Sequence, residues 1–137
     1  MLIEDGLELL ADEDCWQLLG SGQVGRVGLT MAALPVIFPV NYVVIDNTIV
    51  FRTSAGSKLA AAARKAVVAF EVDDYEHTDR SGWSVLAVGR AEIVHDLDVT
   101  AKVLAAGLEP WAEGRRTDLV RITPEFLSGR RIVHPRG

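Results

Sequence analysis

Short apolar segments with the two-residue period of β-strands run through most of the chain, and they constrain its fold more than any other feature. In the first segment Val27, Leu29 and Met31 alternate with polar residues and glycine, as they do in a strand that buries one face. The further segments that predict strands are residues 36–44, 48–52, 66–72, 82–94 and 119–122. Because these strands do not alternate regularly with helices, they favour an antiparallel barrel over a parallel α/β sheet.

Three short helical segments accompany the strands. The first begins at Asp12, which suits an N-cap, and ends at Gly20, a residue type that is common at helix ends. The second covers residues 58–65, where strong helix formers dominate. The third covers residues 98–108 and ends before Pro110, because proline has no amide hydrogen with which to continue a helix. The sequence therefore predicts a mainly β protein with short helical additions.

Turn-forming and polar residues divide the strands further. Asp46-Asn47 predicts a tight hairpin turn. Pro39 lies inside a predicted strand and cannot donate to the hydrogen-bond ladder, so we expect an edge or a break of the sheet there. The polar residues 73–81 predict a loop between two strands.

The composition is that of an ordinary globular domain and argues against several other classes. The 137 residues, 49% hydrophobic and 24% charged, predict one domain over residues 1–137. A formal net charge of −5 argues against binding of nucleic acid through its phosphates. The longest apolar stretch, residues 29–40, is too short to cross a membrane, and the first residues lack a signal-peptide pattern. We therefore expect a cytoplasmic protein with neither a nucleic-acid nor a membrane partner.

Nothing in the sequence marks a metal site or a reactive thiol. Cys15 lies on the apolar face of the first predicted helix, so we expect it in the core. His77, His95 and His134 are scattered without metal-ligand spacing. Since no general acid or base stands out either, the catalytic residues stay unassigned.

The segment from Arg52 to Lys58 carries the clearest chemical signal. It joins a strand to a helix through small and hydroxyl residues, and the free amides at the start of a helix attract anions. Arg52 is able to bind a phosphate with two hydrogen bonds, and Lys58 adds a point charge. Thr53, Ser54 and Ser57 supply short hydroxyl donors. These residues predict a phosphate site, although a capped surface helix with solvated cations accounts for them equally well.

A series of short motifs follows in a specific order. The motifs are Gly25-Arg26-Val27-Gly28, Pro39-Val40-Asn41-Tyr42, Phe51-Arg52-Thr53, Gly56-Ser57-Lys58-Leu59, Phe70-Glu71-Val72-Asp73, Gly82-Trp83-Ser84-Val85 and Gly89-Arg90-Ala91. In this order, from Cys15 to Arg131, the chain resembles the pyridoxamine 5′-phosphate oxidase-like flavoproteins. The resemblance is greatest to the small branch that includes nitroimidazole-resistance-type reductases.

The resemblance implies a split β-barrel with antiparallel, Greek-key-like topology. It also implies a homodimer with two flavins at the subunit interface, each site taking a small-molecule substrate. The residues that would hold the flavin phosphate are Arg52, Thr53, Ser57 and Lys58. Those that would lie along the isoalloxazine edge, largely through backbone groups, are Pro39, Val40, Asn41 and Tyr42. Trp83 and Ser84 would approach the flavin from the dimer interface.

The same resemblance implies an FMN-binding oxidoreductase that passes hydride or electrons to a small organic acceptor. The alternatives are a non-catalytic protein that binds or stores FAD or haem, and a deazaflavin-dependent reductase. Arg52 occupies a position where many small family members have histidine, which is consistent with a more highly charged coenzyme tail. Pyridoxal phosphate synthesis is not expected, because Arg131 and His134 resemble the C-terminal substrate clamp only loosely.

Overall fold

The computed structural model describes residues 2–4, 7–109 and 116–132. In this part of the chain, eight antiparallel strands form one sheet and three helices accompany it. The strands are β1 (Leu2–Glu4), β2 (Leu7–Leu10), β3 (Val24–Met31), β4 (Leu34–Ile45), β5 (Thr48–Ser54), β6 (Val67–Glu76), β7 (Ser81–Val94) and β8 (Thr117–Ile132). The helices are α1 (Asp12–Ser21), α2 (Lys58–Ala63) and α3 (Leu97–Ala105).

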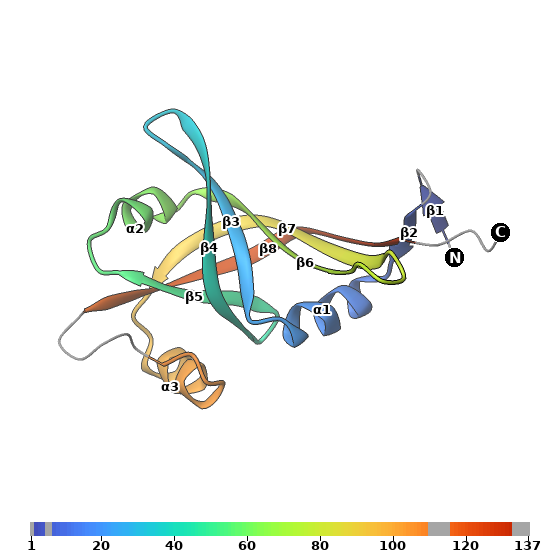
Figure 1. Ribbon diagram of the computed structural model, residues 1–137. Coiled ribbons are helices and arrows are strands. Elements are labelled where there is room, and N and C mark those ends of the chain that lie inside the picture. The colour runs from blue at the N-terminus through green and yellow to red at the C-terminus, as the bar shows by residue number, and fades with distance from the viewer. Residues whose placement is uncertain (1, 5–6, 110–115, 133–137) are drawn as a thin grey trace.

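Six of the strands close into a barrel (Figure 1). Their order around it is β8, β5, β4, β3, β6 and β7, and β7 pairs with β8 to complete the ring. β3, β4 and β5 are consecutive neighbours, whereas β6 returns after α2 to lie beside β3, which is the order of a Greek key. The predicted mainly β, antiparallel split-barrel fold with short helices is confirmed.

Alternate residues of the strands fill the barrel interior. Val27, Phe51 and Phe70 are fully buried there, and α1 and α2 add Cys15 and Ala63 to the same cluster. Cys15 is a free cysteine in the core, as the sequence predicts. Burial raises the pKa of its thiol, so at neutral pH the reactive thiolate is a minor form.

A second, smaller cluster lies outside the barrel, under α3. Val99 and Val103 of α3 pack there with Val50 of β5, Val94 of β7 and Leu119 of β8. The two faces of β5 are therefore both buried, one against the barrel core and the other under α3. The side chains that follow Val50 and Phe51 along β5 alternate between these two faces, so neighbouring side chains lie in different surroundings.

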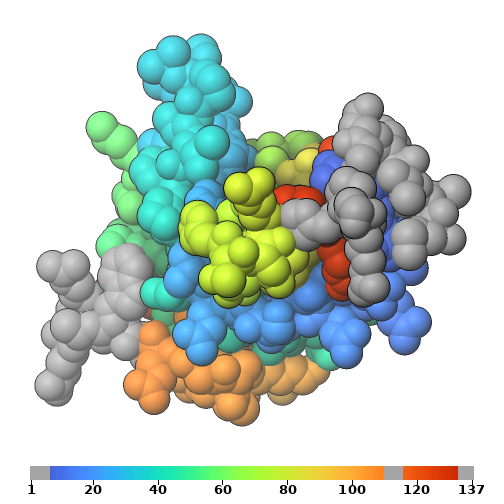
Figure 2. Space-filling model, turned by 45° about the vertical axis from the view of Figure 1, so that its right-hand side comes forward, coloured from blue at the N-terminus to red at the C-terminus, as the bar shows by residue number. Residues whose placement is uncertain are grey.

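β4 and β5 separate part-way along their length. They pair from Tyr42 and Phe51 to Ile45 and Thr48. Beyond this point, residues 34–41 of β4 pair with β3 alone, and residues 52–54 of β5 pair with β8 alone. Pro39 thus lies on a free strand edge, one of the two outcomes expected from the sequence. The two strands form a fork, and the β3–β4 hairpin stands out from the body of the molecule (Figure 2).

The strand bounds differ from the prediction in two places. β6 continues to Glu76, and its residues 73–76 pair with residues 81–84 of β7. The loop predicted for residues 73–81 is therefore confined to the turn at residues 77–80. Polar residues are tolerated in this part of β6 because it is exposed to solvent. β8 is also much longer than the predicted 119–122, since it pairs with β2, β5 and β7.

The helix ends differ by smaller amounts. Ala11, not Asp12, is the N-cap of α1 and makes no side-chain cap bond; the acidic residues lie in the first turn, where the helix dipole favours them. α2 ends at Ala63, before Lys65 with its left-handed φ of 57°. α3 begins earlier than predicted because the carboxylate of Asp96 caps it by accepting from the amide of Asp98 at 2.8 Å. Over the described residues, no helix has the length and apolarity needed to span a bilayer.

Candidate functional site

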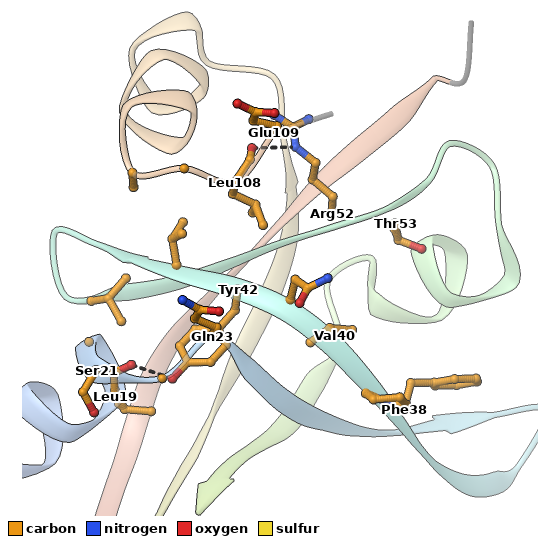
Figure 3. Close-up of a pocket in the computed structure, with 18 of the residues that line it drawn as sticks. Leu19, Ser21, Gln23, Phe38, Val40, Tyr42, Arg52, Thr53, Leu108 and Glu109 are labelled. Carbon is orange, nitrogen blue, oxygen red and sulfur yellow. Dashed lines mark hydrogen bonds between the residues drawn. The ribbon is translucent and has the colours of Figure 1, made fainter. Parts of the chain in front are cut away.

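A pocket of about 800 Å³ lies in the fork between β4 and β5 (Figure 3). Its lining consists of residues 19–23 at the end of α1, residues 38–44 of β4, Arg52 and Thr53 of β5, Leu59 of α2 and residues 106–109 after α3. This volume is in the range of pockets that hold cofactors and other small molecules. The pocket has an apolar side along β4 and a polar end at β5.

The β4 side of the pocket contains all four residues predicted for the isoalloxazine edge, Pro39, Val40, Asn41 and Tyr42. Residues 39–41 belong to the free strand edge, so their outward-facing backbone groups have no partner strand there. The side chain of Tyr42 is instead buried, and its hydroxyl donates a hydrogen bond to the carbonyl of Leu19 at 2.5 Å. Burial raises the pKa of Tyr42 to about 12, so the phenol stays protonated and serves as a fixed donor.

Arg52 lies at the polar end and is 92% buried, with only 8% of its surface exposed. Its Nε donates to the carbonyl of Leu108 at 3.1 Å, and its Nη1 donates to Oγ1 of Thr117 at 3.1 Å. Nη2 is buried and has no hydrogen-bond partner among the described residues. No ion pair found among the described residues includes Arg52, and burial lowers the pKa of its guanidinium.

The other predicted phosphate residues lie on the α2 side of β5. Oγ of Ser57 is 3.1 Å from Oγ1 of Thr53, and it accepts the amide hydrogen of Ala60 at 3.0 Å as the N-cap of α2. Ser54 is half-buried and Lys58 is exposed. Thr53 lines the pocket, whereas Ser54, Ser57 and Lys58 are not among its lining residues. Ser57 therefore has the capping role that the structural interpretation of this segment expects, and phosphate binding by the group stays a prediction.

Trp83 and Ser84 are placed apart from the pocket. Trp83 packs against the barrel core, and Ser84 stands opposite Asp73 of β6 and Arg130 of β8. Neither residue is part of the pocket lining within one chain. Their predicted approach to a flavin thus requires the second subunit and stays a prediction.

The sequence analysis missed two segments that line the pocket. Residues 20–22 had been interpreted only as the end of α1, and residues 106–109 as the end of a helix. Both segments contain glycine, and Gly107 has a φ of 94° that disfavours other residues. The small residues at these helix ends were the available signal.

A separate shallow groove of about 320 Å³ lies on the outer face of β3, β4 and β6. Arg26 bridges the carboxylates of Glu71 and Asp73 there at 3.3 and 3.2 Å. Burial first, and then the nearby Asp73, raise the pKa of Glu71 to about 7, although Arg26 acts in the opposite direction. These residues form a strand-to-strand ion-pair cluster away from the pocket.

Of the three histidines, His77 and His95 are exposed and His134 lies outside the described residues. Over the residues that the structure covers, no group of three His, Cys, Asp or Glu side chains is arranged to hold a metal ion. Arg131, which is described, is exposed at the end of β8.

Comparison with known proteins identifies the family. The family model for pyridoxamine 5′-phosphate oxidase matches residues 11–131. The chain belongs to the pyridoxamine 5′-phosphate oxidase family. A relative in Mycobacterium tuberculosis, the uncharacterized protein Rv0080, is 40% identical over 132 residues, which cover 93% of this chain and 86% of that protein.

Solved structures add a flavin protein to these relatives. The FAD binding protein from Mycobacterium smegmatis is 39% identical, with a TM-score of 0.78 over 90% of this chain and 97% of that one. The FAD and heme binding protein from the same organism, at 17% identity and a TM-score of 0.73 over 97% and 77% of the two chains, shares the fold. Of these two neighbours, the FAD binding protein at 39% identity bears on the cofactor, whereas the second shows the fold alone.

Proposed function

We propose that the pocket in the β4–β5 fork binds a flavin coenzyme and that the protein is a flavin-dependent oxidoreductase. The observation that carries this proposal is the guanidinium of Arg52, which is buried at the polar end of the pocket with Nη2 unpaired. An uncompensated buried cation is costly unless a ligand neutralises it. An anionic group on the tail of a flavin coenzyme is such a ligand.

The rest of the pocket fits the other half of a flavin. The free edge of residues 38–41 offers apolar side chains and unpaired backbone groups to a flat ring with polar atoms on its rim. At the other end, Arg52, Thr53, Ser54, Ser57 and Lys58 would hold the anionic tail of the coenzyme. The buried hydroxyl of Tyr42 ties β4 to α1 and so keeps the strand edge in place.

A bound flavin would supply hydride or electrons to a small organic acceptor. The protein's own contribution would be position and electrostatics, because among the described lining residues no general acid or base is present apart from the exposed Glu109. The fixed donors of the described pocket are Tyr42 and Arg52. Their arrangement supports binding of the coenzyme more directly than it supports any one acceptor.

Two flavin coenzymes are candidates, beside the deazaflavin coenzyme that the sequence analysis gives as an alternative. The family resemblance implies FMN, and FMN is the coenzyme that we predicted from the sequence. The relative from M. smegmatis is an FAD binding protein at 39% identity, which favours FAD as the second candidate. Both coenzymes carry the ring and the first phosphate that the pocket would hold.

The proposal includes a homodimer in the cytoplasm. Trp83 and Ser84 lie outside the pocket of their own chain, so they would reach a flavin only in the pocket of a second subunit. Sedimentation equilibrium at micromolar concentration is expected to give twice the chain mass of 14.9 kDa. A monomer under those conditions would remove these two residues from the site.

The test has a binding step and a turnover step. We expect the purified protein, or apo-protein titrated with FMN and FAD, to show a flavin absorption spectrum and saturable binding at micromolar concentration. With a reductant and a panel of acceptors, sustained turnover supports the oxidoreductase. Binding without turnover points to a flavin storage protein. If none of the flavins binds, the proposal is refuted.

A further inference from the structure

We propose that Arg52 forms an anion site of its own, which binds a second anionic group on the coenzyme tail beyond the 5′-phosphate of FMN. The second phosphate of FAD is such a group, and so is a carboxylate on the tail of a deazaflavin coenzyme. The inference rests on the proposed function, because it assigns a further group of the same bound coenzyme. It makes Arg52 a specificity residue and favours a dinucleotide over FMN.

The geometry of β5 separates Arg52 from the hydroxyl residues. Consecutive side chains of a strand point to opposite faces. Thr53 shares its face with Phe51 of the barrel core and contacts Ser57 at 3.1 Å. Arg52 shares its face with Val50 under α3 and reaches the carbonyl of Leu108 (Figure 3). The two polar positions therefore lie on opposite sides of the strand.

One ligand is nevertheless able to reach both positions. Residues 52–54 of β5 have no strand paired on their β4 side, because β4 leaves β5 after Tyr42. The pocket opens in this fork, and Arg52 and Thr53 both line it. A phosphate beside Thr53 and a second anion beside Arg52 can belong to one extended tail that passes the edge of β5.

The contacts of Arg52 explain its position but not its charge. Nε and Nη1 connect β5 to the segments around Leu108 and Thr117, and a neutral donor would make similar hydrogen bonds. Nη2 makes no such connection, since it is buried and has no partner within the part of the chain that the structure describes. Glu109 stands at the same end of the pocket in Figure 3, exposed and without an ion pair to Arg52. The described surroundings thus leave a buried positive charge for a ligand to neutralise.

A charge-assisted contact to the second anion is expected to increase affinity roughly 10- to 100-fold. Apo-protein titrated with riboflavin, FMN and FAD should therefore bind FAD at least about tenfold more tightly than FMN. In Arg52→Met, which keeps an unbranched side chain without the charge, this preference for FAD is expected to disappear while FMN affinity changes less than about threefold. Lys58→Met is the matched control, which should weaken FMN and FAD together and keep their ratio.

The outcomes separate this inference from the proposed function. If the unmodified protein binds no flavin or deazaflavin, the proposed function fails and the inference fails with it. If the protein binds FMN and FAD equally, and Arg52→Met changes both or neither, the anion site is refuted while flavin binding stands. Titration of the unmodified protein and of Arg52→Met with a deazaflavin coenzyme that carries a glutamyl tail distinguishes a carboxylate from a second phosphate. If Arg52→Met weakens only this coenzyme, Arg52 binds a carboxylate; if it weakens only FAD, Arg52 binds the second phosphate. Circular dichroism and thermal melting check that Arg52→Met folds; if it does not, Arg52→Lys and Arg52→Gln, with and without charge, provide the same comparison.

Discussion

Ser57→Asp separates the capping role of Ser57 from its predicted role at the coenzyme phosphate. In the structure Oγ of Ser57 accepts the amide hydrogen of Ala60 at 3.0 Å and contacts Oγ1 of Thr53 at 3.1 Å. Aspartate is as good an N-cap as serine, and its carboxylate is able to accept from both groups. The free energy of unfolding without coenzyme should therefore change by less than about 0.5 kcal/mol.

The effect on coenzyme affinity should be large, because the new carboxylate lies where the phosphate is predicted to bind. Two unit charges about 4 Å apart repel by roughly 4 kcal/mol at the effective dielectric constant near a protein surface. Solvent and the nearby Lys58 reduce this figure, so we expect FMN affinity to fall by about 30-fold or more. Riboflavin has the same ring without the phosphate, and its affinity should change by less than about threefold.

The assay is titration of apo-protein by flavin fluorescence, with urea unfolding as the check on stability. Thr30→Asp adds the same charge on an exposed position of β3 outside the pocket lining, and it is the control for net charge. Unchanged FMN affinity in a stable Ser57→Asp protein would refute the phosphate position. An equal loss of riboflavin and FMN would show that the substitution distorts the pocket.

Three further predictions concern stability. The pKa of Glu71 is raised from 4.5 to about 7, so the folded state binds more protons than the unfolded state between these values, and stability falls as pH rises through this window. Glu71→Gln removes this titration, so its stability relative to the unmodified protein should be higher at pH 8 than at pH 4.5. Because the side chain is more than a third exposed, the gain in urea unfolding should be only about 1 kcal/mol. Gly89→Ala would force a Cβ against the backbone oxygen of Thr123 and should destabilise the protein by about 3 kcal/mol or abolish folding, while Gly20→Ala, with open space around it, should be neutral or slightly stabilising in thermal melts. Tyr42→Phe removes the buried donor to a carbonyl of α1 and should cost about 1–3 kcal/mol in urea unfolding; a change below about 0.5 kcal/mol would show that this bond is not needed.

The sequence predicted those turns whose conformation is favoured by the residue types within the turn. Asp46-Asn47 forms the expected hairpin turn, with φ values of 49° and 59°, because these residues tolerate the left-handed region. The turn at Ala32-Ala33 has similar φ values of 50° and 66°, yet alanine gives no such signal. There the pairing of β3 with β4 on both sides of the turn imposes the conformation.

The longest strand illustrates what local patterns omit. β8 contains Pro124 and Gly129, which disfavour an interior strand. The structure accommodates them through long-range contacts: the register of the β7–β8 pair shifts beside Pro124, between Val88 and Gly89 of β7, and Cys15 of α1 packs where Gly129 lacks a side chain. Neither contact is visible from sequence neighbours, so the strand was predicted far too short.

The candidate site was predictable on its strand side only. Pro39 marked the free edge and Arg52 the polar end, because both signals reside in single residues. The burial of Arg52 depends on α3 and Thr117, more than 40 residues away along the chain, and sequence spacing does not contain that information. The same holds for residues 106–109, which complete the pocket from the end of α3.

The most direct test of the account is a crystal structure of the protein saturated with FAD. We predict the flavin ring against residues 38–42 of β4, the first phosphate beside Thr53 and Ser57, and the second within hydrogen-bond distance of Arg52. Coenzyme bound elsewhere on the protein, with the β4–β5 fork empty, would contradict the central claim.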